Sequence, residues 1–219
     1  MGVFFLFINI IFIMKRIILS LGLLLSLGSV FSQSFMQGAG VSFIGASPTD
    51  NGSFLGVALT YSPRINFYET ERYSVSLGVP ISFGVSTGNR NLTDTTLGLI
   101  QTYPASYSGT CIYIPIHINF NIGRGSSKTN NEMLGYFLGA GYGFYSASYS
   151  SISSDYATGN GTDHASSSTS GLNIDGGMRF GVGRGHKKHP KNIEVSVSYT
   201  KGSSILANSI YGVGCSFNF

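Results

Sequence analysis

Apolar residues alternate strictly with polar or small residues over residues 109–122. Isoleucine or phenylalanine stands at every even position from Ile112 to Ile122, and the odd positions carry Cys, Tyr, Pro, His and Asn. A side-chain period of two with one wholly apolar face is the pattern of a β-strand. The same test predicts eight strands, over residues 37–46, 53–67, 73–86, 109–122, 133–149, 171–183, 192–201 and 207–219.

The second face of these strands decides what they can build. It carries mainly Gly, Ser and Asn, and only 10% of the chain is charged, against roughly 25% in an ordinary soluble domain. Such small residues protect a surface poorly in water but fit the crowded interior of a narrow barrel. We therefore expect an all-β fold, an eight-stranded antiparallel up-and-down transmembrane β-barrel with its apolar face toward lipid. A soluble eight-stranded barrel is the alternative.

The start of the chain predicts a secretory signal peptide. The basic pair Lys15-Arg16 precedes a short apolar run that ends in small residues, so we assign residues 1–32 to the signal peptide and 33–219 to the barrel. Because an apolar stretch stands before the basic pair, Met14 is the expected true start. An uncleaved membrane helix is the alternative, but the basic pair interrupts the roughly 20 apolar residues that a span needs.

The connections between the strands predict an orientation. Two of them are long, residues 87–108 and 150–170, and both are odd-numbered when counted from the first strand. Outer-membrane barrels combine long outer loops with short periplasmic turns. We therefore expect two long extracellular loops, both mature termini in the periplasm, and a location in the cell outer membrane among its lipid and lipopolysaccharide.

Several segments resemble the small outer-membrane β-barrel proteins of Bacteroidetes-type bacteria, a PorT-like barrel domain family, over essentially all of the mature chain. They are Tyr61-Ser-Pro-Arg-Ile-Asn66, Ser76-Leu-Gly-Val-Pro-Ile-Ser82, Ile114-Pro-Ile-His-Ile-Asn-Phe-Asn-Ile-Gly-Arg-Gly125, Gly135-Tyr-Phe-Leu-Gly-Ala-Gly-Tyr-Gly143 and Ser198-Tyr-Thr-Lys-Gly202. The resemblance implies fold and location but no activity, although some relatives serve in protein secretion. It also implies that the end of the chain, with Tyr211, Phe217 and the terminal Phe219, is the assembly signal recognised by the barrel-assembly machinery.

Five ionisable residues fall on the face that should line the lumen: Arg64, His117, Asp175, Arg179 and Glu194. Charge inside a narrow barrel is costly unless it is paired. A turn centred in residues 184–191 would place Arg179 diagonal to Glu194 on the next strand. We expect an ion-pair and hydrogen-bond network that plugs the lumen, with His117 as a satisfied interior histidine rather than a metal ligand. A proton or solute path through this network is the alternative.

No pattern predicts a cofactor, a metal ion or catalysis. The glycines of residues 135–143 share one strand face, whereas a phosphate cradle needs a strand-to-helix turn, so close packing in the barrel explains them better. His186 and His189 flank two lysines without further ligands, which predicts a solvated periplasmic turn. Asp155, Asp163 and His164 in loop 150–170 leave a lipid A-modifying enzyme as an alternative, although a Ser-rich loop suits mobility rather than locked catalytic geometry.

The predicted function is structural or interactive. The charges are spread along the chain, so a nucleic-acid footprint is not indicated, and Cys111 and Cys215 are expected on opposite faces, which argues against a disulfide between them. Eight strands leave an interior filled by side chains rather than an open pore. An accessory subunit of a protein-secretion or envelope-assembly machine is the alternative, and its partner would be an envelope or secretion protein.

Overall fold

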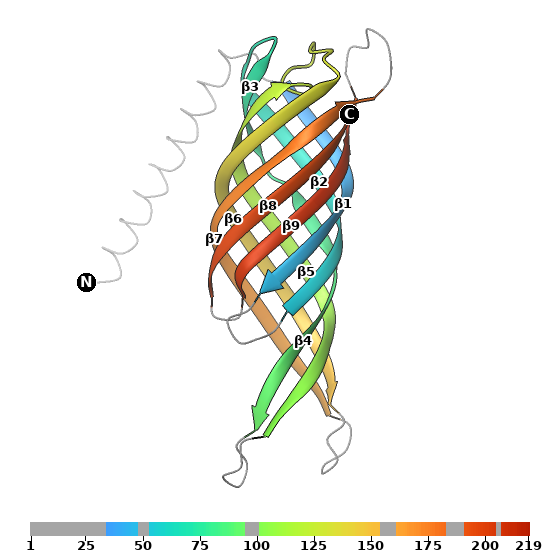
Figure 1. Ribbon diagram of the computed structural model, residues 1–219, viewed down its shortest axis with the longest axis vertical. Helices are drawn as coiled ribbons and strands as arrows, with labels where there is room; N and C mark the ends of the chain where they lie inside the picture. Colours follow the sequence, from blue (N-terminus) through green and yellow to red (C-terminus); the bar gives the residue numbers. More distant parts are fainter. Residues whose placement is uncertain (1–33, 48–52, 95–100, 154–160, 183–190, 205–206) are drawn as a thin grey trace, which may run out of the picture.

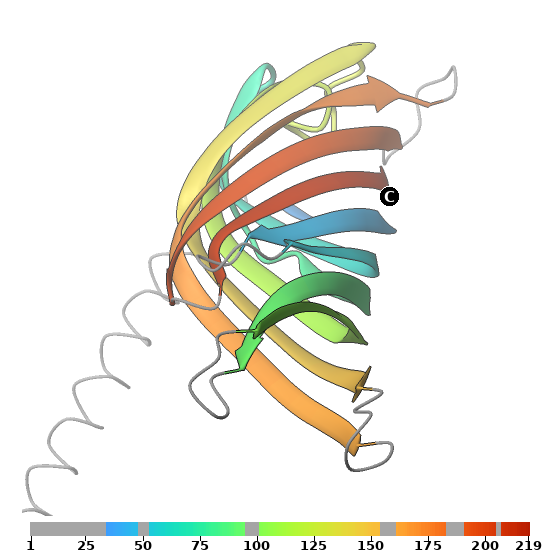
Figure 2. The same ribbon diagram turned by 60° about the horizontal axis from the view of Figure 1, so that its bottom comes forward.

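The computed structural model describes residues 34–47, 53–94, 101–153, 161–182, 191–204 and 207–219. They form one antiparallel sheet that closes on itself (Figures 1 and 2), because β1 (Ser34–Ser47) pairs with β2 (Ser53–Glu69) on one side and with β9 (Ala207–Asn218) on the other. Between them the ring runs through β4 (Ile81–Asp94), β5 (Gln101–Gly123), β6 (Leu134–Ser153), β7 (Gly161–Gly181) and β8 (Asn192–Ser204). None of the described residues belongs to a helix long and apolar enough to cross a membrane. The predicted signal peptide lies outside the described residues.

Nine strands make a ring of eight, because the short β3 (Tyr73–Gly78) and β4 are two parts of one interrupted strand. Both pair with β2 on one side and with β5 on the other. The interruption falls at Val79-Pro80, where proline has no N–H for the ladder. The Val79 N–H donates instead to the Pro63 carbonyl at 3.1 Å. The predicted eight-stranded antiparallel barrel is confirmed, and the break lies inside the single strand predicted over residues 73–86.

The two faces of the wall follow the predicted alternation. Large apolar side chains cover the outside, where Ile118 is 56%, Leu138 71% and Leu172 73% exposed. The inside is polar, and its fully buried side chains include Arg179 and Asn173. This is the reverse of the usual distribution in water-soluble proteins, where charged side chains are seldom buried.

The two predicted long loops are mostly strand, so that prediction was wrong in extent. β4 and β5 stay in register as far as Asp94↔Gln101, and β6 and β7 as far as Ser153↔Gly161. Only residues 95–100 and 154–160 separate these strands, and they lie outside the described residues. The sequence here has Ser, Thr and Gly at both odd and even positions, so no apolar alternation marks the strands. Backbone hydrogen bonds continue the ladder without regard to side chains.

Strands β4 to β7 run on past the ends of their neighbours at one end of the barrel (Figure 1). The pairing of β2 with β4 stops at Ser53↔Asn89, and that of β7 with β8 stops at Gly171↔Gly202. We call residues 90–94, 101–110, 146–153 and 161–170 the extension. Along its far side, residues 161–168 of β7 pair with β6 alone among the described strands.

Candidate functional site: the polar barrel interior

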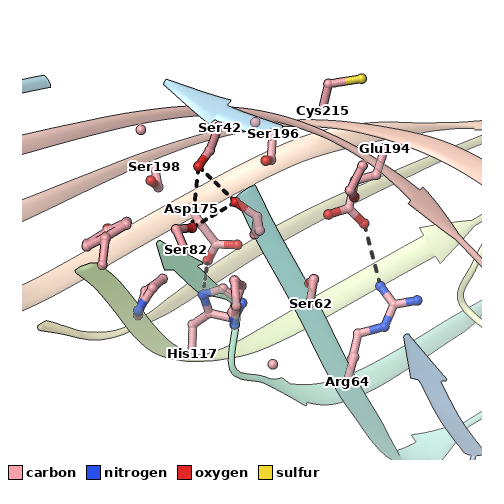
Figure 3. Close-up of a pocket in the computed structure, with 18 of the residues that line it drawn as sticks. Ser42, Ser62, Arg64, Ser82, His117, Asp175, Glu194, Ser196, Ser198 and Cys215 are labelled. Atoms are coloured by element: carbon pink, nitrogen blue, oxygen red, sulfur yellow. Dashed lines mark hydrogen bonds and ion pairs between the residues drawn. The ribbon is translucent and has the colours of Figure 1, made fainter. Parts of the chain in front are cut away.

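Glu194 is the centre of an ionic cluster at the barrel end away from the extension. Its Oε2 accepts a hydrogen bond from Arg179 Nε at 2.6 Å and another from Asn218 Nδ2 at 3.1 Å. Arg64 Nη1, from β2 across the lumen, lies 3.9 Å from the same oxygen (Figure 3). Arg179 and Glu194 are directly opposite in register rather than diagonal. The structure therefore brings three of the five predicted lumen residues into one contact.

Arg179 is almost entirely enclosed and uses its remaining donors on neutral groups. Its Nη1 donates to Asn121 Oδ1 at 2.8 Å, and its guanidinium carbon lies 4.3 Å from the centre of the Phe137 ring. Only 1% of the Arg179 side chain is exposed. A buried guanidinium is tolerated when its donors are satisfied and a charge or an aromatic face lies against it, and here Glu194, Asn121 and Phe137 provide those contacts.

His117 and Asp175 form a second contact in the interior. His117 Nδ1 lies 3.5 Å from Asp175 Oδ1 (Figure 3), yet neither atom has a hydrogen-bond partner. The prediction of a satisfied interior histidine therefore does not hold for Nδ1, because the Asp175 carboxylate lies close to it without forming a hydrogen bond. Both side chains line a cavity of about 80 Å³, to which Arg64 and Glu194 also contribute.

The connection between β5 and β6 closes over the ionic cluster, which the sequence did not predict. Gly123 and Gly125 adopt φ of 72° and 77°, a left-handed conformation that glycine enters without strain. The chain then turns inward, and its carbonyls accept hydrogen bonds from wall side chains: Gly125 from Arg64 Nη2 at 3.0 Å and Ser126 from Asn66 Nδ2 at 2.9 Å. We call residues 124–130 the cap.

The cap is bound on both sides of the barrel end. Arg124 Nη2 donates to the Lys191 carbonyl at 2.8 Å, next to β8, while Asn130 Nδ2 donates to the Glu71 carbonyl at 2.7 Å, between β2 and β3. Burial lowers the pKa of the Arg124 guanidinium from its usual value. The sequence does carry one signal for the cap, which is the pair of glycines, Gly123 and Gly125, on either side of Arg124. An ordinary turn between two strands would not need both glycines.

Hydroxyl and amide groups fill the middle of the barrel. Thr60 Oγ1 lies 2.8 Å from the hydroxyls of both Ser42 and Ser82, and the latter two side chains point toward each other in Figure 3. On the opposite wall, Asn173 Nδ2 donates to the Tyr113 hydroxyl at 3.0 Å and to Thr200 Oγ1 at 2.9 Å. Three of these contacts join neighbouring strands, and the contact of Asn173 with Tyr113 joins β7 to β5 across β6.

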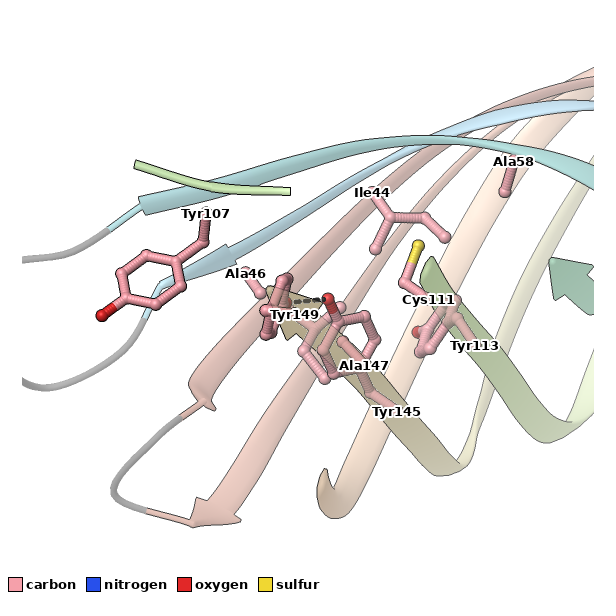
Figure 4. Close-up of a cluster of buried hydrophobic side chains, with 10 residues drawn as sticks. Ile44, Ala46, Ala58, Tyr107, Cys111, Tyr113, Tyr145, Ala147 and Tyr149 are labelled. Atoms are coloured by element: carbon pink, nitrogen blue, oxygen red, sulfur yellow. Dashed lines mark hydrogen bonds between the residues drawn. The ribbon is translucent and has the colours of Figure 1, made fainter. Parts of the chain in front are cut away.

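An apolar and aromatic layer lies toward the extension (Figure 4). The Tyr145 and Tyr149 hydroxyls are 2.9 Å apart, and Phe54 stacks on Tyr149 with ring centres 4.4 Å apart. Cys111 is buried in this layer, whereas Cys215 is exposed on the outer face and both are free. The predicted placement of the two cysteines on opposite faces is confirmed.

Glycines on β6 allow these interior contacts by leaving out a side chain. A Cβ added at Gly139 would lie 1.7 Å from Asn119 Oδ1, and one added at Gly143 would lie 2.5 Å from Thr200 Oγ1. Real Cβ atoms never approach other atoms so closely, so the neighbours occupy the space above each glycine. Close packing, rather than a phosphate cradle, accounts for this row.

The predicted assembly residues lie on the outer surface at the end of the chain. Tyr211 is 54%, Phe217 38% and Phe219 49% exposed, and the rings of the last two stack with centres 6.3 Å apart.

The His186–His189 turn and Asp155 lie outside the described residues, while Asp163 and His164 belong to the paired part of β7. Within the described ranges, no three or more His, Cys, Asp or Glu side chains gather as a metal site.

No protein-family model matches the chain, and no curated protein matches it in sequence. Among solved structures, Ail, the attachment invasion locus protein of Yersinia pestis, is 16% identical over 86% of this chain and 99% of that chain, with a TM-score of 0.47. Neisserial surface protein A is 13% identical over 85% and 97%, with a TM-score of 0.40. The outer membrane protein OprG from Pseudomonas aeruginosa is 11% identical over 86% and 96%, with a TM-score of 0.44. Similarity at this level does not transfer a function.

Proposed function

We propose that the chain is an integral protein of the cell outer membrane whose lumen is plugged and whose extension reaches outside the cell to bind a partner, without catalysis. The observation that carries the proposal is the change of the outer face from apolar to polar where the extension begins. The Bacteroidetes-type family assignment remains a prediction of the sequence.

The apolar part of the wall has the height of a membrane. On β5 the outward apolar residues run from Ile112 to Ile122, which is about 33 Å of strand at roughly 3.3 Å per residue. With a strand tilt of about 40°, this corresponds to a height of about 25 Å, the usual apolar band of an outer-membrane barrel. A belt of that height favours lipid contact around the whole ring.

The wall turns polar just past this belt. Beyond Ile112, the next outward residue on β5 is the exposed Thr110, and beyond Phe144 on β6 it is the exposed Ser146. Because a lipid-exposed strand would keep its apolar residues, this change supports an aqueous environment for the extension. Longer outer segments and shorter periplasmic turns then favour an extracellular extension, with the cap and Phe219 on the periplasmic side.

The interior favours a structural or interactive role over transport. The cap, the Glu194 cluster and the aromatic layer fill successive levels of the lumen, and the cavity of about 80 Å³ between them has room for only a few water molecules. The extension favours an interactive role, because residues 161–168 of β7 leave one row of backbone groups without a strand neighbour in the described part of the chain. Such edges are the usual place where another chain adds a strand.

The orientation is tested by labelling single cysteines on intact cells. The background variant Cys215→Ser removes the exposed native thiol, and Cys111 stays because it is buried. In this background, Ser168→Cys puts a thiol on an exposed residue of the extension, and Thr129→Cys puts one on an exposed residue of the cap. A membrane-impermeant maleimide should label Ser168→Cys in intact cells and Thr129→Cys only after the outer membrane is permeabilised. The reverse pattern, or labelling of both in intact cells, would contradict the proposal.

The partner is tested separately. Shortening the extension by replacing residues 90–105 and 150–166 with tight turns should leave a folded barrel, seen as heat-modifiable migration on gels, but remove any stoichiometric partner that co-purifies with the wild-type protein from outer membranes. A partner retained at full stoichiometry would rule out the extension as its binding site. An envelope or secretion protein as that partner would favour the accessory-subunit alternative.

A further inference from the structure

Several buried polar atoms in the barrel have no hydrogen-bond partner, and three of them lie around the Asp175 carboxylate. They are His117 Nδ1, Asn119 Oδ1 and Asp175 Oδ1, on side chains from β5 and β7. The three residues are 6%, 3% and 7% exposed, so bulk water does not reach these atoms. A buried polar atom without a partner is destabilising. With the His117 proton on Nε2, all three atoms are acceptors, which a positive or proton-donating group among them would satisfy.

The distance between two of these atoms is too long for a good hydrogen bond. His117 Nδ1 and Asp175 Oδ1 are 3.5 Å apart (Figure 3), whereas N–H···O bonds fall at about 2.7–3.2 Å. Two ligands of one tetrahedral ion, each about 2.0–2.1 Å from it, stand about 3.3–3.4 Å from each other. The observed separation therefore fits two ligands of one ion.

Charge supports the same conclusion. Asp175 is a buried carboxylate, and its only ion-pair neighbour among the described residues is His117. The two nearby guanidinium groups, Arg64 and Arg179, are both paired with Glu194. A buried carboxylate without a full positive charge beside it is costly, and a bound cation would remove that cost.

The wall makes room for this group of atoms. A Cβ at Gly139 would lie 1.7 Å from Asn119 Oδ1 and 2.4 Å from Asp175 Oδ1, so the two oxygens share the space above this glycine. Turning the Asn119 amide would let it donate to Asp175, but would leave His117 Nδ1 unbonded and the carboxylate charge uncompensated. The adjoining cavity, which His117, Asn119 and Asp175 all line, can supply water as a further ligand.

We propose that His117, Asn119 and Asp175 bind a divalent transition-metal ion of the zinc class inside the barrel, with cavity water completing its coordination. An imidazole nitrogen with a carboxylate oxygen suits zinc, nickel or copper, whereas calcium and magnesium take oxygen ligands. The ion links β5 to β7 across Gly139 of β6.

The test uses the tag-free full chain, refolded into detergent from a metal-free denatured state in the presence of Zn²⁺ or Co²⁺. After removal of free metal, we expect about one ion per folded chain and, with Co²⁺, the visible absorption of a tetrahedral site. His117→Gln and Asp175→Asn should each weaken binding by at least about 100-fold, since losing even an outer-shell partner of a metal site costs 10–100-fold. Heat-modifiable migration verifies that each variant is folded.

Two controls separate this site from other sources of binding. Ser196→Ala changes another residue that lines the cavity, and the double variant His186→Gln/His189→Gln removes the histidines of the basic turn; both should keep the ion. The proposal is overturned if the folded wild-type chain takes up no metal, if His117→Gln retains it, or if the double variant loses it. If a lumen variant does not fold, metal uptake by the folded wild-type chain is the measurement that decides whether the proposal stands.

Discussion

Replacing Glu194 by glutamine tests the ionic cluster most directly, because it removes one charge and keeps the shape. The carboxylate faces two guanidinium groups whose side chains are only 1% (Arg179) and 8% (Arg64) exposed. Breaking a buried ion pair by neutralising one partner costs about 3–5 kcal/mol. Arg179 keeps its bond to Asn121, and Arg64 keeps its bond to the Gly125 carbonyl, so we expect the lower end, a loss of about 3 kcal/mol in the free energy of unfolding.

The measurement is reversible urea unfolding of the refolded barrel in lipid vesicles, followed by circular dichroism because the chain has no tryptophan. Ser196→Ala, two residues along β8 on the same inner face, is the matched control and should change stability by less than about 1 kcal/mol. The double variant Arg179→Gln/Glu194→Gln should lose about 1–3 kcal/mol less than the sum of the single losses, since it removes both charges of one contact. A Glu194→Gln barrel within about 0.5 kcal/mol of wild type, or strict additivity in the cycle, would show that the cluster does not stabilise the barrel.

Three other changes probe the packing, the belt and the chain end. Gly139→Ala should destabilise the barrel by about 1–3 kcal/mol in the same unfolding assay, because the new methyl group overlaps Asn119 Oδ1; an unchanged stability would mean that the space above Gly139 is open. Ile118→Arg, in the middle of the apolar belt, should cost about 2–4 kcal/mol in vesicles, while Ser148→Arg in the extension should cost about 0–1; equal losses would contradict the position of the membrane boundary. Phe219→Ala should lower the amount of folded protein in the outer membrane several-fold without changing refolding in detergent, and equal amounts in cells would argue against an assembly role for this residue.

The strands of the membrane belt could be predicted because each carries its own pattern. On β5 the alternation from Ile112 to Ile122 identifies a strand and its two faces without reference to any other segment, and seven more such patterns lead to the ring. The Arg179–Glu194 contact could be predicted for a similar reason, since a single short turn separates the two strands. The sequence predicted that Arg179 and Glu194 are diagonal neighbours, whereas the structure places them directly opposite each other. The register was missed because nothing in the sequence of residues 184–191 fixes the centre of the turn.

The extension could not be predicted from side chains. Its sequence has Ser, Thr and Gly at both odd and even positions, so the apolar period of two disappears from residues 87–108 and 150–170 although the ladder continues through them. Backbone hydrogen bonds, which are the same for every residue type except proline, hold this part of the sheet together. The break at Val79-Pro80 was overlooked for the opposite reason, because its side chains keep the alternation while the backbone leaves the ladder.

By itself, the sequence determined the all-β class, the number of strands in the ring, and which face of each strand is apolar, because these properties depend on residues two positions apart. The tertiary structure alone decided that the cap turns inward, that Arg64 joins Arg179 at Glu194, and that His117 stops short of Asp175. Each of these contacts joins strands that are not neighbours in the sheet or a connection folded back across the barrel end. Their distances follow from the closure of the ring and from the space above particular glycines, which no local pattern in the chain records.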